Sequence, residues 1–443
     1  MQKEAPAEAV VAIKSMNSKI YNKLLIQRYP TPEFSYARLR NRHASQRELS
    51  RTLSRSLRQV LARSLSLVIG ICFCGTALSS VLPEDRADVL YHSYDGGGVS
   101  INGPSVLVRK GFKKKYSASA NYYVDKVSSA SIDVLTTASE YTEERTEYSL
   151  GLDYLDNKTT LSTGYGRSTE NDYDAQTVFF NLSQDFFGDL TTLSLGYSQG
   201  SDVVTQTGND DFSEKVNRKN YKLSLTQILT QNFIANVSYE TITDQGYLNN
   251  PYRLVRFRDP DPDREGAHVF EQERYPSTRT SDAVSVRGIY YLPYRAALKA
   301  EYRYYADSWA IKADTFGIEY RHPFKEHWLA EFRVRQYSQT GADFFSDLFE
   351  RGNSQAFLAR DKELSDFDSL TLGATISYEL KFKHQKILER MAVTFAYDRI
   401  NFDYDEFREI DPDTQNTDAA ISGTEPFYSF SANVIRFYVS AWY

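Results

Sequence analysis

The sequence contains one pattern that a hydrolase could use, Gly196-Tyr-Ser198-Gln-Gly200, which fits the G-x-S-x-G of a serine nucleophile elbow. Such an elbow places its serine on a sharp turn between a strand and a helix. The residues after Gly200 show no helical periodicity, so Ser198 is expected to be a small inward-facing residue of a strand. No other nucleophile and base can be paired from the sequence, and no enzymatic activity is predicted.

Histidine is the next residue type with chemical potential. Of the six histidines, only His322 and His327 lie close together, on either side of one expected turn. They could meet a metal ion, but a zinc site needs at least a third protein ligand, and none is close in sequence. Both are expected to decorate a turn, and no cofactor is predicted.

Two segments, "RDPDPDRE" and "DPDTQNTD", are rich in carboxylates. Calcium takes about 6–8 oxygen ligands, often from alternating acidic residues. The spacing and the glycine of an EF-hand are absent, and prolines stiffen the first segment. We therefore expect solvated loop acids, with these as weak metal candidates: Asp259, Asp261, Asp263, Asp411 and Asp413.

The elements that carry these residues are predicted to be long strands. In residues 370–381, Leu370, Leu372 and Ala374 share one parity with further apolar residues, while polar residues and Gly373 occupy the other. Period two over ten or more residues is long for a soluble strand, where about 5–6 residues are typical. It fits the roughly 9–11 residues with which a tilted strand crosses a bilayer. No segment after the first 79 residues approaches 18 uncharged apolar residues.

Short turns alternate with long polar loops along the chain, as in a transmembrane antiparallel β-barrel with short periplasmic turns and long extracellular loops. The long loops are expected at 128–145, 200–217, 244–279, 340–365 and 405–425. About fourteen strands are predicted between residues 115 and 443: 115–127, 145–155, 158–168, 174–185, 189–200, 218–229, 232–243, 280–292, 294–306, 309–321, 327–339, 366–381, 389–404 and 427–443.

The composition favours an all-β chain. Aromatic residues, which are enriched in strands, are abundant, with 33 Tyr and 26 Phe, whereas the chain has only 3 Met. The net charge of −6 hides a basic start: residues 1–63 hold 13 Lys and Arg against 4 Glu. The uncharged run Leu65–Leu78 follows, then small residues, which is the order of a secretory signal peptide. Residues 1–79 are therefore interpreted as a basic leader plus signal peptide with a start site assigned too far upstream, and no nucleic-acid partner is expected.

Residues 80–114 precede the first strand of the predicted barrel. We expect them in the periplasm or the lumen, as a plug with Gly96–Gly98 as its hinge. The alternative is that Ser105–Arg109 pairs as an additional strand, which with one more strand would give a sixteen-stranded barrel.

The polar parity of the strands between 280 and 339 carries six basic and three acidic residues. A charge facing acyl chains would cost about 2–4 kcal/mol at the bilayer midplane, so these residues are expected to face the lumen. The excess of positive charge could favour the passage of anions. The alternative is that opposite charges on neighbouring strands pair with one another and only stabilise the barrel wall. The predicted lumenal band is Arg287, Lys299, Glu301, Arg303, Glu319, Arg321, Glu331, Arg333 and Arg335.

The last strand ends on an aromatic residue and has apolar residues at every second position, which is typical of barrels handed to the outer-membrane insertion machinery. The expected signal consists of Ile435, Phe437, Val439, Ala441 and Tyr443. The predicted partners are therefore this machinery, outer-membrane lipid and lipopolysaccharide, and an envelope protein of unknown identity.

Several segments also carry a resemblance to a known family: "EDRADVLYHSYDGGGVSINGPSVLVRK", "LSQDFFGDLTTLSLGYS", "YETITDQGYLNNPYR", "QTGADFFSDLF" and "FLARDKELS". Nearly all of residues 84–443 resembles the DUF3570 family. The resemblance implies an outer-membrane barrel of a Gram-negative bacterium and assigns no biochemical role.

Two functions remain open from the sequence. A fourteen-stranded barrel encloses a lumen wider than that of the eight-stranded barrels that side chains fill, so a pore or transporter for a small solute is favoured, with anions as the candidate class because of the positive band. The alternative is a non-conducting scaffold of an envelope complex.

Overall fold

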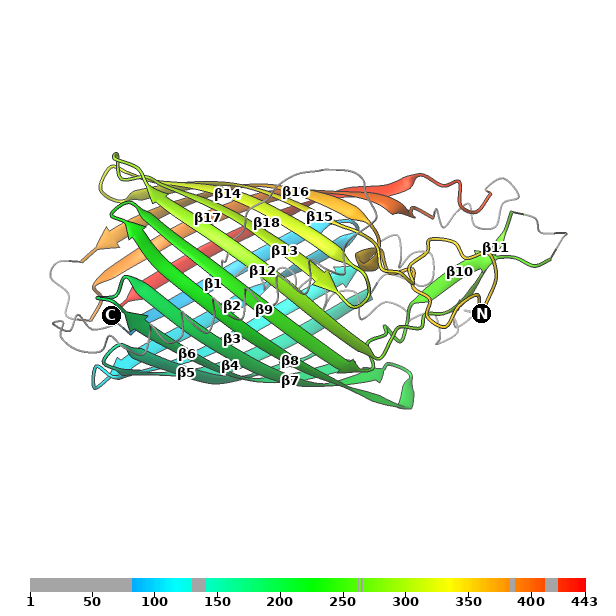
Figure 1. Ribbon diagram of the computed structural model, residues 1–443, viewed down its shortest axis with the longest axis horizontal. Helices are drawn as coiled ribbons and strands as arrows, with labels where there is room; N and C mark the ends of the chain where they lie inside the picture. The colour runs from blue at the N-terminus through cyan, green and yellow to red at the C-terminus, as the bar shows by residue number, and fades with distance from the viewer. Residues whose placement is uncertain (1–81, 130–140, 262, 264–265, 383–386, 411–420) are drawn as a thin grey trace, which may run out of the picture. The chain divides into compact units, whose positions relative to one another are not determined.

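The chain forms a closed antiparallel β-barrel of sixteen strands, with a separate two-stranded sheet, β10–β11, in one of its loops (Figure 1). The computed structural model describes residues 82–129, 141–261, 263, 266–382, 387–410 and 421–443. Within these residues no helix is long and apolar enough to cross a membrane.

The sixteen strands of the wall, β1–β9 and β12–β18, follow one another in chain order, each antiparallel to its neighbours, while β10 and β11 pair only with each other. Their bounds are β1 Arg86–Gly96, β2 Val99–Phe112, β3 Tyr116–Ser129, β4 Tyr141–Asp156, β5 Thr159–Thr169, β6 Tyr173–Phe186, β7 Thr191–Gln206, β8 Asn209–Thr230, β9 Phe233–Gly246, β10 Leu254–Arg258, β11 His268–Gln272, β12 Thr278–Tyr291, β13 Ala297–Asp307, β14 Lys312–Phe324, β15 Trp328–Gln339, β16 Phe367–Lys381, β17 Arg390–Arg408 and β18 Phe427–Trp442.

All fourteen strands expected from the alternation are present, but the count of fourteen was wrong and the sixteen-stranded alternative is confirmed. The barrel begins at Arg86 rather than at residue 115, because residues 80–114 contribute β1 and β2 to the wall. Gly96–Gly98 is no hinge to a plug. Gly97 and Gly98 have φ of 60° and 73°, the left-handed values that a tight two-residue turn between paired strands requires.

β1 closes the barrel against β18, in a register that runs from Arg86 opposite Trp442 to Gly96 opposite Ala432. An unpaired first or last strand would leave backbone groups that lipid cannot satisfy, so the N-terminal segment is needed in the wall. The seam is fastened further by the Tyr443 N–H, which donates to the Asp85 carbonyl at 3.4 Å.

The expected long loop at 200–217 is another correction. β7 continues to Gln206 and β8 begins at Asn209, so the two strands run on as a tight hairpin. β8 has 22 residues, and its exposed apolar residues Tyr221, Leu223 and Leu225 lie only in its second half. The first half therefore extends the wall beyond the apolar part of the outer surface.

The outward face of the barrel carries an apolar band with aromatic residues at both edges. At the end with the short turns, aromatic rings pair between adjacent strands, as Tyr116 does with Tyr154 and Trp328 with Tyr378. At the opposite edge, tyrosine hydroxyls bond polar outward side chains. Tyr239 donates to Asp282 at 2.6 Å, and Tyr91, Tyr165, Tyr197, Tyr302 and Tyr397 make bonds of the same kind.

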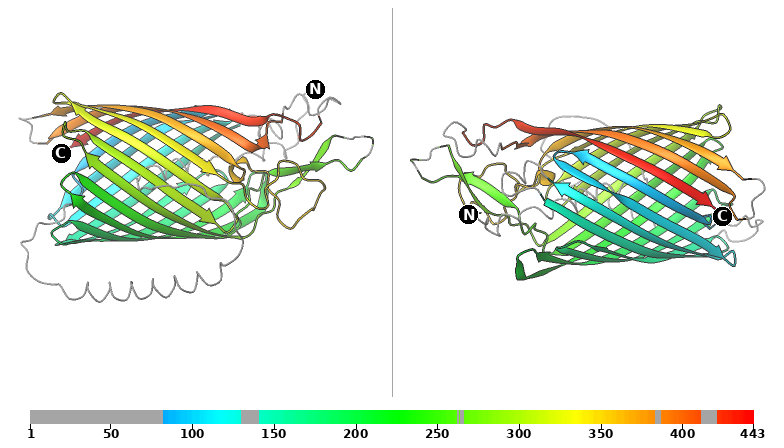
Figure 2. Two further views of the ribbon diagram at one scale, coloured as in Figure 1. Left: turned by 45° about the horizontal axis from the view of Figure 1, so that its top comes forward. Right: turned by 180° about the vertical axis from the view of Figure 1, so that it is seen from behind.

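Three long connections gather at the end of the barrel opposite the short turns (Figure 2). They run from β9 to β12, from β15 to β16 and from β17 to β18, and they contain β10, β11 and the 3-10 turn η4, Lys362–Leu364. We call their described residues the loop cap: 247–261, 263, 266–277, 340–366, 409–410 and 421–426.

Candidate functional site

The nine residues of the predicted lumenal band lie on β12, β13, β14 and β15 and share the inward face of the wall. The residues between them in sequence are exposed on the outer surface; for example, Phe332 and Val334, which flank Arg333, are 59% and 48% exposed. Direct opposition across neighbouring strands brings the charges together, as in Lys299 opposite Glu319 and Arg321 opposite Glu331. We call this set of nine the charge ladder.

Most of the charge ladder is paired. Lys299 lies 3.0 Å from Glu301 and 3.2 Å from Glu319. The guanidinium of Arg321 lies 2.6 Å from a carboxylate oxygen of Glu331. Arg287 lies 3.6 Å from Glu301. Such pairs stabilise the wall and leave little free charge for a solute.

Sequence reasoning missed the residues that extend the ladder beyond its four strands. On β9, Glu240 lies 3.2 Å from Arg303. On β17, Asp398 accepts from Arg333 at 2.6 Å and also binds Arg436 of β18. With these three residues the set holds seven basic and five acidic side chains, so the predicted positive wall is mostly neutralised. Long-range strand pairing hides these partners from a linear pattern.

A glycine makes room for the tightest of these pairs. Gly373 lies directly between Arg333 on β15 and Asp398 on β17 in the register of β16. A Cβ at Gly373 would lie 2.0 Å from Asp398 Oδ1 and 2.8 Å from Arg333 Nε. The missing side chain therefore allows the guanidinium and the carboxylate to meet across an intervening strand.

The other side of the lumen has a different character. On β5, β6, β7 and β8 the inward positions opposite one another are mostly small or uncharged and polar, as in Ser194 opposite Ser224 and Asn181 opposite Gly196. Ser198 lies on this face within β7, opposite Phe179 and Asn220, and no helix follows it. It is a strand residue and not part of a nucleophile elbow.

The loop cap is held together by a buried arginine. Arg256 on β10 has no exposed surface, and its guanidinium pairs with Asp347 and lies 2.5 Å from Glu425. Asp347 also pairs with Arg360 at 2.9 Å. Since these residues come from all three long connections, one ion network ties the connections to one another.

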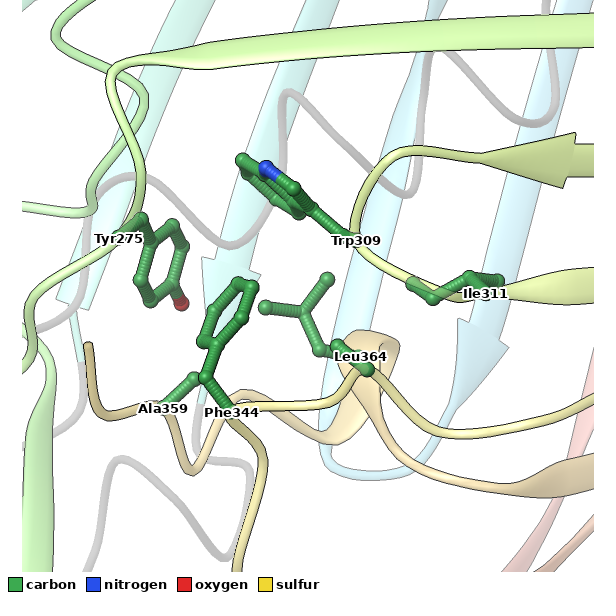
Figure 3. Packing of buried hydrophobic residues seen from close by; sticks show 7 residues of the cluster. Tyr275, Trp309, Ile311, Phe344, Ala359 and Leu364 are labelled. Carbon is green, nitrogen blue, oxygen red and sulfur yellow. The ribbon is translucent and has the colours of Figure 1, made fainter. Parts of the chain in front are cut away.

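Apolar contacts reinforce this network (Figure 3). Tyr275 of the first connection packs against Trp309, which lies in the β13–β14 turn, and against Phe344 of the second connection. The cluster also contains Ile311, Ala342, Ala359 and Leu364. The cap is a folded unit with a core of its own, which the sequence reading as polar loops did not anticipate.

The turn η4 carries this cap onto the barrel wall. Asp361 lies 3.3 Å from Arg253 of the first connection. The ammonium of Lys362 lies 5.3 Å from the centre of the Tyr428 ring on β18. The Gln339 amide at the end of β15 donates to the Ser365 carbonyl at 2.8 Å. The second connection therefore folds back against the mouth.

Three carboxylates at this end of the barrel could hold a cation. Glu143 on β4 and Glu170 and Asp172 in the β5–β6 turn bring one oxygen each within 4.8 Å of one another. Burial raises the pKa of Glu170 to about 8, an effect that Glu143 and Asp172 increase and Arg145 opposes. Arg145 Nε lies 3.6 Å from Glu170, so a cation would compete with a guanidinium already present. In the sequence this group is marked only by Glu170-Asn-Asp172 in a short turn, and acidic residues in a turn are too common to indicate a cation site by themselves.

The predicted metal candidates do not assemble into such a group among the described residues. Asp259 and Asp261 accept from the backbone N–H two residues later at 3.0 Å, as loop acids do. Asp263 is described in the same loop, whereas Asp411 and Asp413 lie outside the described residues. His322 Nδ1 lies in hydrogen-bond contact with the Tyr320 hydroxyl at 2.7 Å, and the His327 ring lies tilted against the Tyr378 ring, with centroids 5.8 Å apart.

The predicted insertion signal lies at the end of β18. Ile435 and Phe437 are 42% and 45% exposed on the outer face, and Val439 and Ala441 share their parity. Tyr443 follows the strand and donates from its hydroxyl to the Arg109 carbonyl at 3.1 Å. Whether these residues are read by an insertion machinery stays a prediction.

The fold and its surfaces define a closed antiparallel β-barrel with an apolar outer band and a polar lumen. The chain belongs to the family described as a protein of unknown function (DUF3570), which matches residues 98–406. No curated protein matches the sequence.

Solved structures similar to this chain are outer-membrane barrels at low identity. A bacterial polysaccharide outer membrane secretin matches with a TM-score of 0.44 and 8% identity, over 82% of this chain and 100% of the other. CdiB from Acinetobacter baumannii matches with 0.42 and 9%, over 81% of this chain and 60% of the other. A Pseudomonas aeruginosa FadL homologue matches with 0.38 and 10%, over 82% and 90%.

Proposed function

We propose that the protein spans the outer membrane of a Gram-negative bacterium as a pore for small anionic solutes, with the loop cap as its gate. The observation that carries the proposal is the inward face of a sixteen-stranded barrel, lined by charged and small polar side chains rather than by an apolar core. Barrels of this size leave an aqueous channel, whereas eight-stranded barrels are filled by side chains.

The outer surface supports the membrane location. Lipid-facing strands need an apolar band, and the amphipathic rings of Tyr and Trp favour its two interfaces. The ring pairs at the short-turn end and the hydroxyl-bonded tyrosines at the other meet this requirement. The expected neighbours are outer-membrane lipid and lipopolysaccharide, and the barrel-insertion machinery would read β18.

The gate follows from the loop cap. Its three connections are joined by Arg256 and by the Tyr275 cluster, and η4 lies against the mouth of the barrel. A folded cap restricts passage through one end of a lumen, whereas the described connections at the other end are short turns. Passage then depends on the strength of the contacts within the cap.

Two measurements test this function. The protein should fractionate with outer membranes and migrate differently on a gel before and after boiling, since closed barrels resist detergent unfolding. Purified protein in planar bilayers should give discrete conductance steps that grow when the cap is loosened, as in Arg256→Met. Recovery in the soluble periplasm would overturn the location.

The second candidate is a non-conducting scaffold of an envelope complex, and the pairing within the charge ladder favours it. Paired opposite charges cross the inward face from β12 to β18, as a purely structural ladder would. If neither the natural chain nor Arg256→Met conducts, the scaffold replaces the pore.

A further inference from the structure

We propose that Arg335 is the binding point for a small oxyanion inside the barrel. The proposal rests on the proposed pore and names the residue that its anionic solutes touch. A carboxylate or phosphate group would pair with the guanidinium fork of Arg335 from the lumen.

Arg335 differs from the rest of the charge ladder because no carboxylate among the described residues pairs with it. Every other basic member has an acidic partner within 4.0 Å, including Arg303 with Glu240 and Arg333 with Asp398. The Arg335 guanidinium lies instead 5.5 Å from the centre of the Tyr337 ring. A ring face supports a guanidinium without using its N–H donors in the ring plane.

The residues opposite Arg335 on both neighbouring strands are small, Gly317 on β14 and Thr371 on β16. The side chain of Glu301 reaches over Gly317, with its carboxylate 3.6 Å from where a Cβ at Gly317 would lie, but it forms no ion pair with Arg335 among the described residues. Val334, the preceding residue, is 48% exposed on the outer surface, which places Arg335 on the lumenal parity. Arg335 is half-buried on this inward face, so part of its side chain is exposed to the lumen.

The electrostatic surroundings favour an anion at this point. The charged groups that act on Arg335 are Glu301, Arg303 and Arg333. Glu301 is already shared by Lys299 and Arg287, and each of the two arginines holds one carboxylate. One uncompensated positive charge therefore remains here. Arg binds carboxylate and phosphate oxygens in a bidentate manner, and such charge-assisted bonds are stronger than neutral ones.

The test uses inorganic phosphate and acetate on the folded full-length barrel. Isothermal titration in detergent should show binding of both anions by the natural chain. Arg335→Gln should weaken it by about tenfold or more, the loss expected for a charged hydrogen-bonded contact. Arg335→Lys should retain part of the affinity but lose the preference for planar bidentate anions. Arg258→Gln removes an exposed cap charge and should bind as the natural chain does.

Bilayer recordings separate this proposal from the proposed function. In a conducting barrel, Arg335→Gln should lower the chloride-over-potassium permeability ratio several-fold and remove the block by phosphate. If the natural chain does not conduct, the pore fails, and the titration still decides the site. Equal phosphate binding by the natural chain and Arg335→Gln, with both showing the same heat-modified migration, overturns the proposal.

Discussion

Gly373 shows how a single residue without a side chain determines which charges meet. Because its Cβ would lie 2.0 Å from Asp398, Gly373→Ala should force the Arg333–Asp398 pair apart and destabilise the barrel by about 1–3 kcal/mol. Urea unfolding of the barrel refolded in lipid vesicles measures this. The control is Gly166→Ala, also on an inward position, where the nearest atom lies 3.6 Å from a new Cβ. Equal unfolding midpoints would contradict the expectation.

Glu170 gives a pH dependence whose sign can be worked out. The folded pKa, raised by burial from 4.5 to about 8, means that the folded state holds its proton more tightly than the unfolded chain. The free energy of unfolding therefore falls as the pH rises from about 5 to 8, because ionisation of the buried carboxyl is unfavourable. Glu170→Gln should flatten this fall and raise stability at pH 8 by about 1–4 kcal/mol.

The matched control for Glu170 is Glu144→Gln. Its side chain is 58% exposed and lies 3.9 Å from Lys126. Unfolding measured from pH 5 to 8 should leave the slope of this variant unchanged. Parallel slopes for the natural chain and Glu170→Gln would show that Glu170 ionises without cost.

Among the elements, the three connections of the loop cap depend on Arg256. Arg256→Met removes a fully buried guanidinium from between the half-buried carboxylates of Asp347 and Glu425, and breaking a buried pair costs about 3–5 kcal/mol. Chymotrypsin should then cleave the cap at least tenfold faster, while the barrel keeps its heat-modified migration. Arg258→Met, which loses only the pair with the 81% exposed Glu350, should cleave as the natural chain does. Equal rates for both variants would remove Arg256 from the centre of the cap.

Strands with one apolar face could be predicted from sequence, and those without one could not. The fourteen wall strands between residues 116 and 442, β3–β9 and β12–β18, follow the alternation, since lipid requires apolar residues at every second position. β1 was not predicted because both of its faces carry apolar residues: Leu90 and Tyr94 face inward, while Val89 and Tyr91 face outward. Its sequence therefore lacks the alternation of apolar and polar residues. β2 was not predicted because it has Gly103 and Pro104 in its middle, and both residue types argue against a strand interior.

The candidate site was predictable only in part for a related reason. The parity of β12–β15 gives the inward side of each charge, but Asp398 and Glu240 come from strands distant in sequence. Nothing local in the sequence marks their register. The apolar cluster around Trp309 likewise joins segments that are distant in sequence, and no periodic pattern in the sequence predicts those contacts.

At the scale of the whole molecule, the β1–β18 seam makes the chain a closed ring of strands. In a chain with Cys72 and Cys74 replaced by Ser, Ser93→Cys and Ile435→Cys lie directly opposite and should form a disulfide on oxidation. The pair Ser93→Cys with Phe437→Cys is displaced by two residues, to about 7–8 Å, and should not. Non-reducing electrophoresis distinguishes the two. Crosslinking of the displaced pair alone would refute the register.

The closeness of Asp85 and Tyr443 also allows a test of the predicted insertion signal in β18. A peptide linker between them would allow new ends to be opened in the β4–β5 turn at Asn157, whose φ of 53° marks a tight exposed bend. Such a circular permutant has the same wall, but β4 becomes its final strand and β18 an internal one. Its export would separate two features that β18 combines in this sequence: closing the ring against β1, and carrying the predicted insertion signal on the final strand.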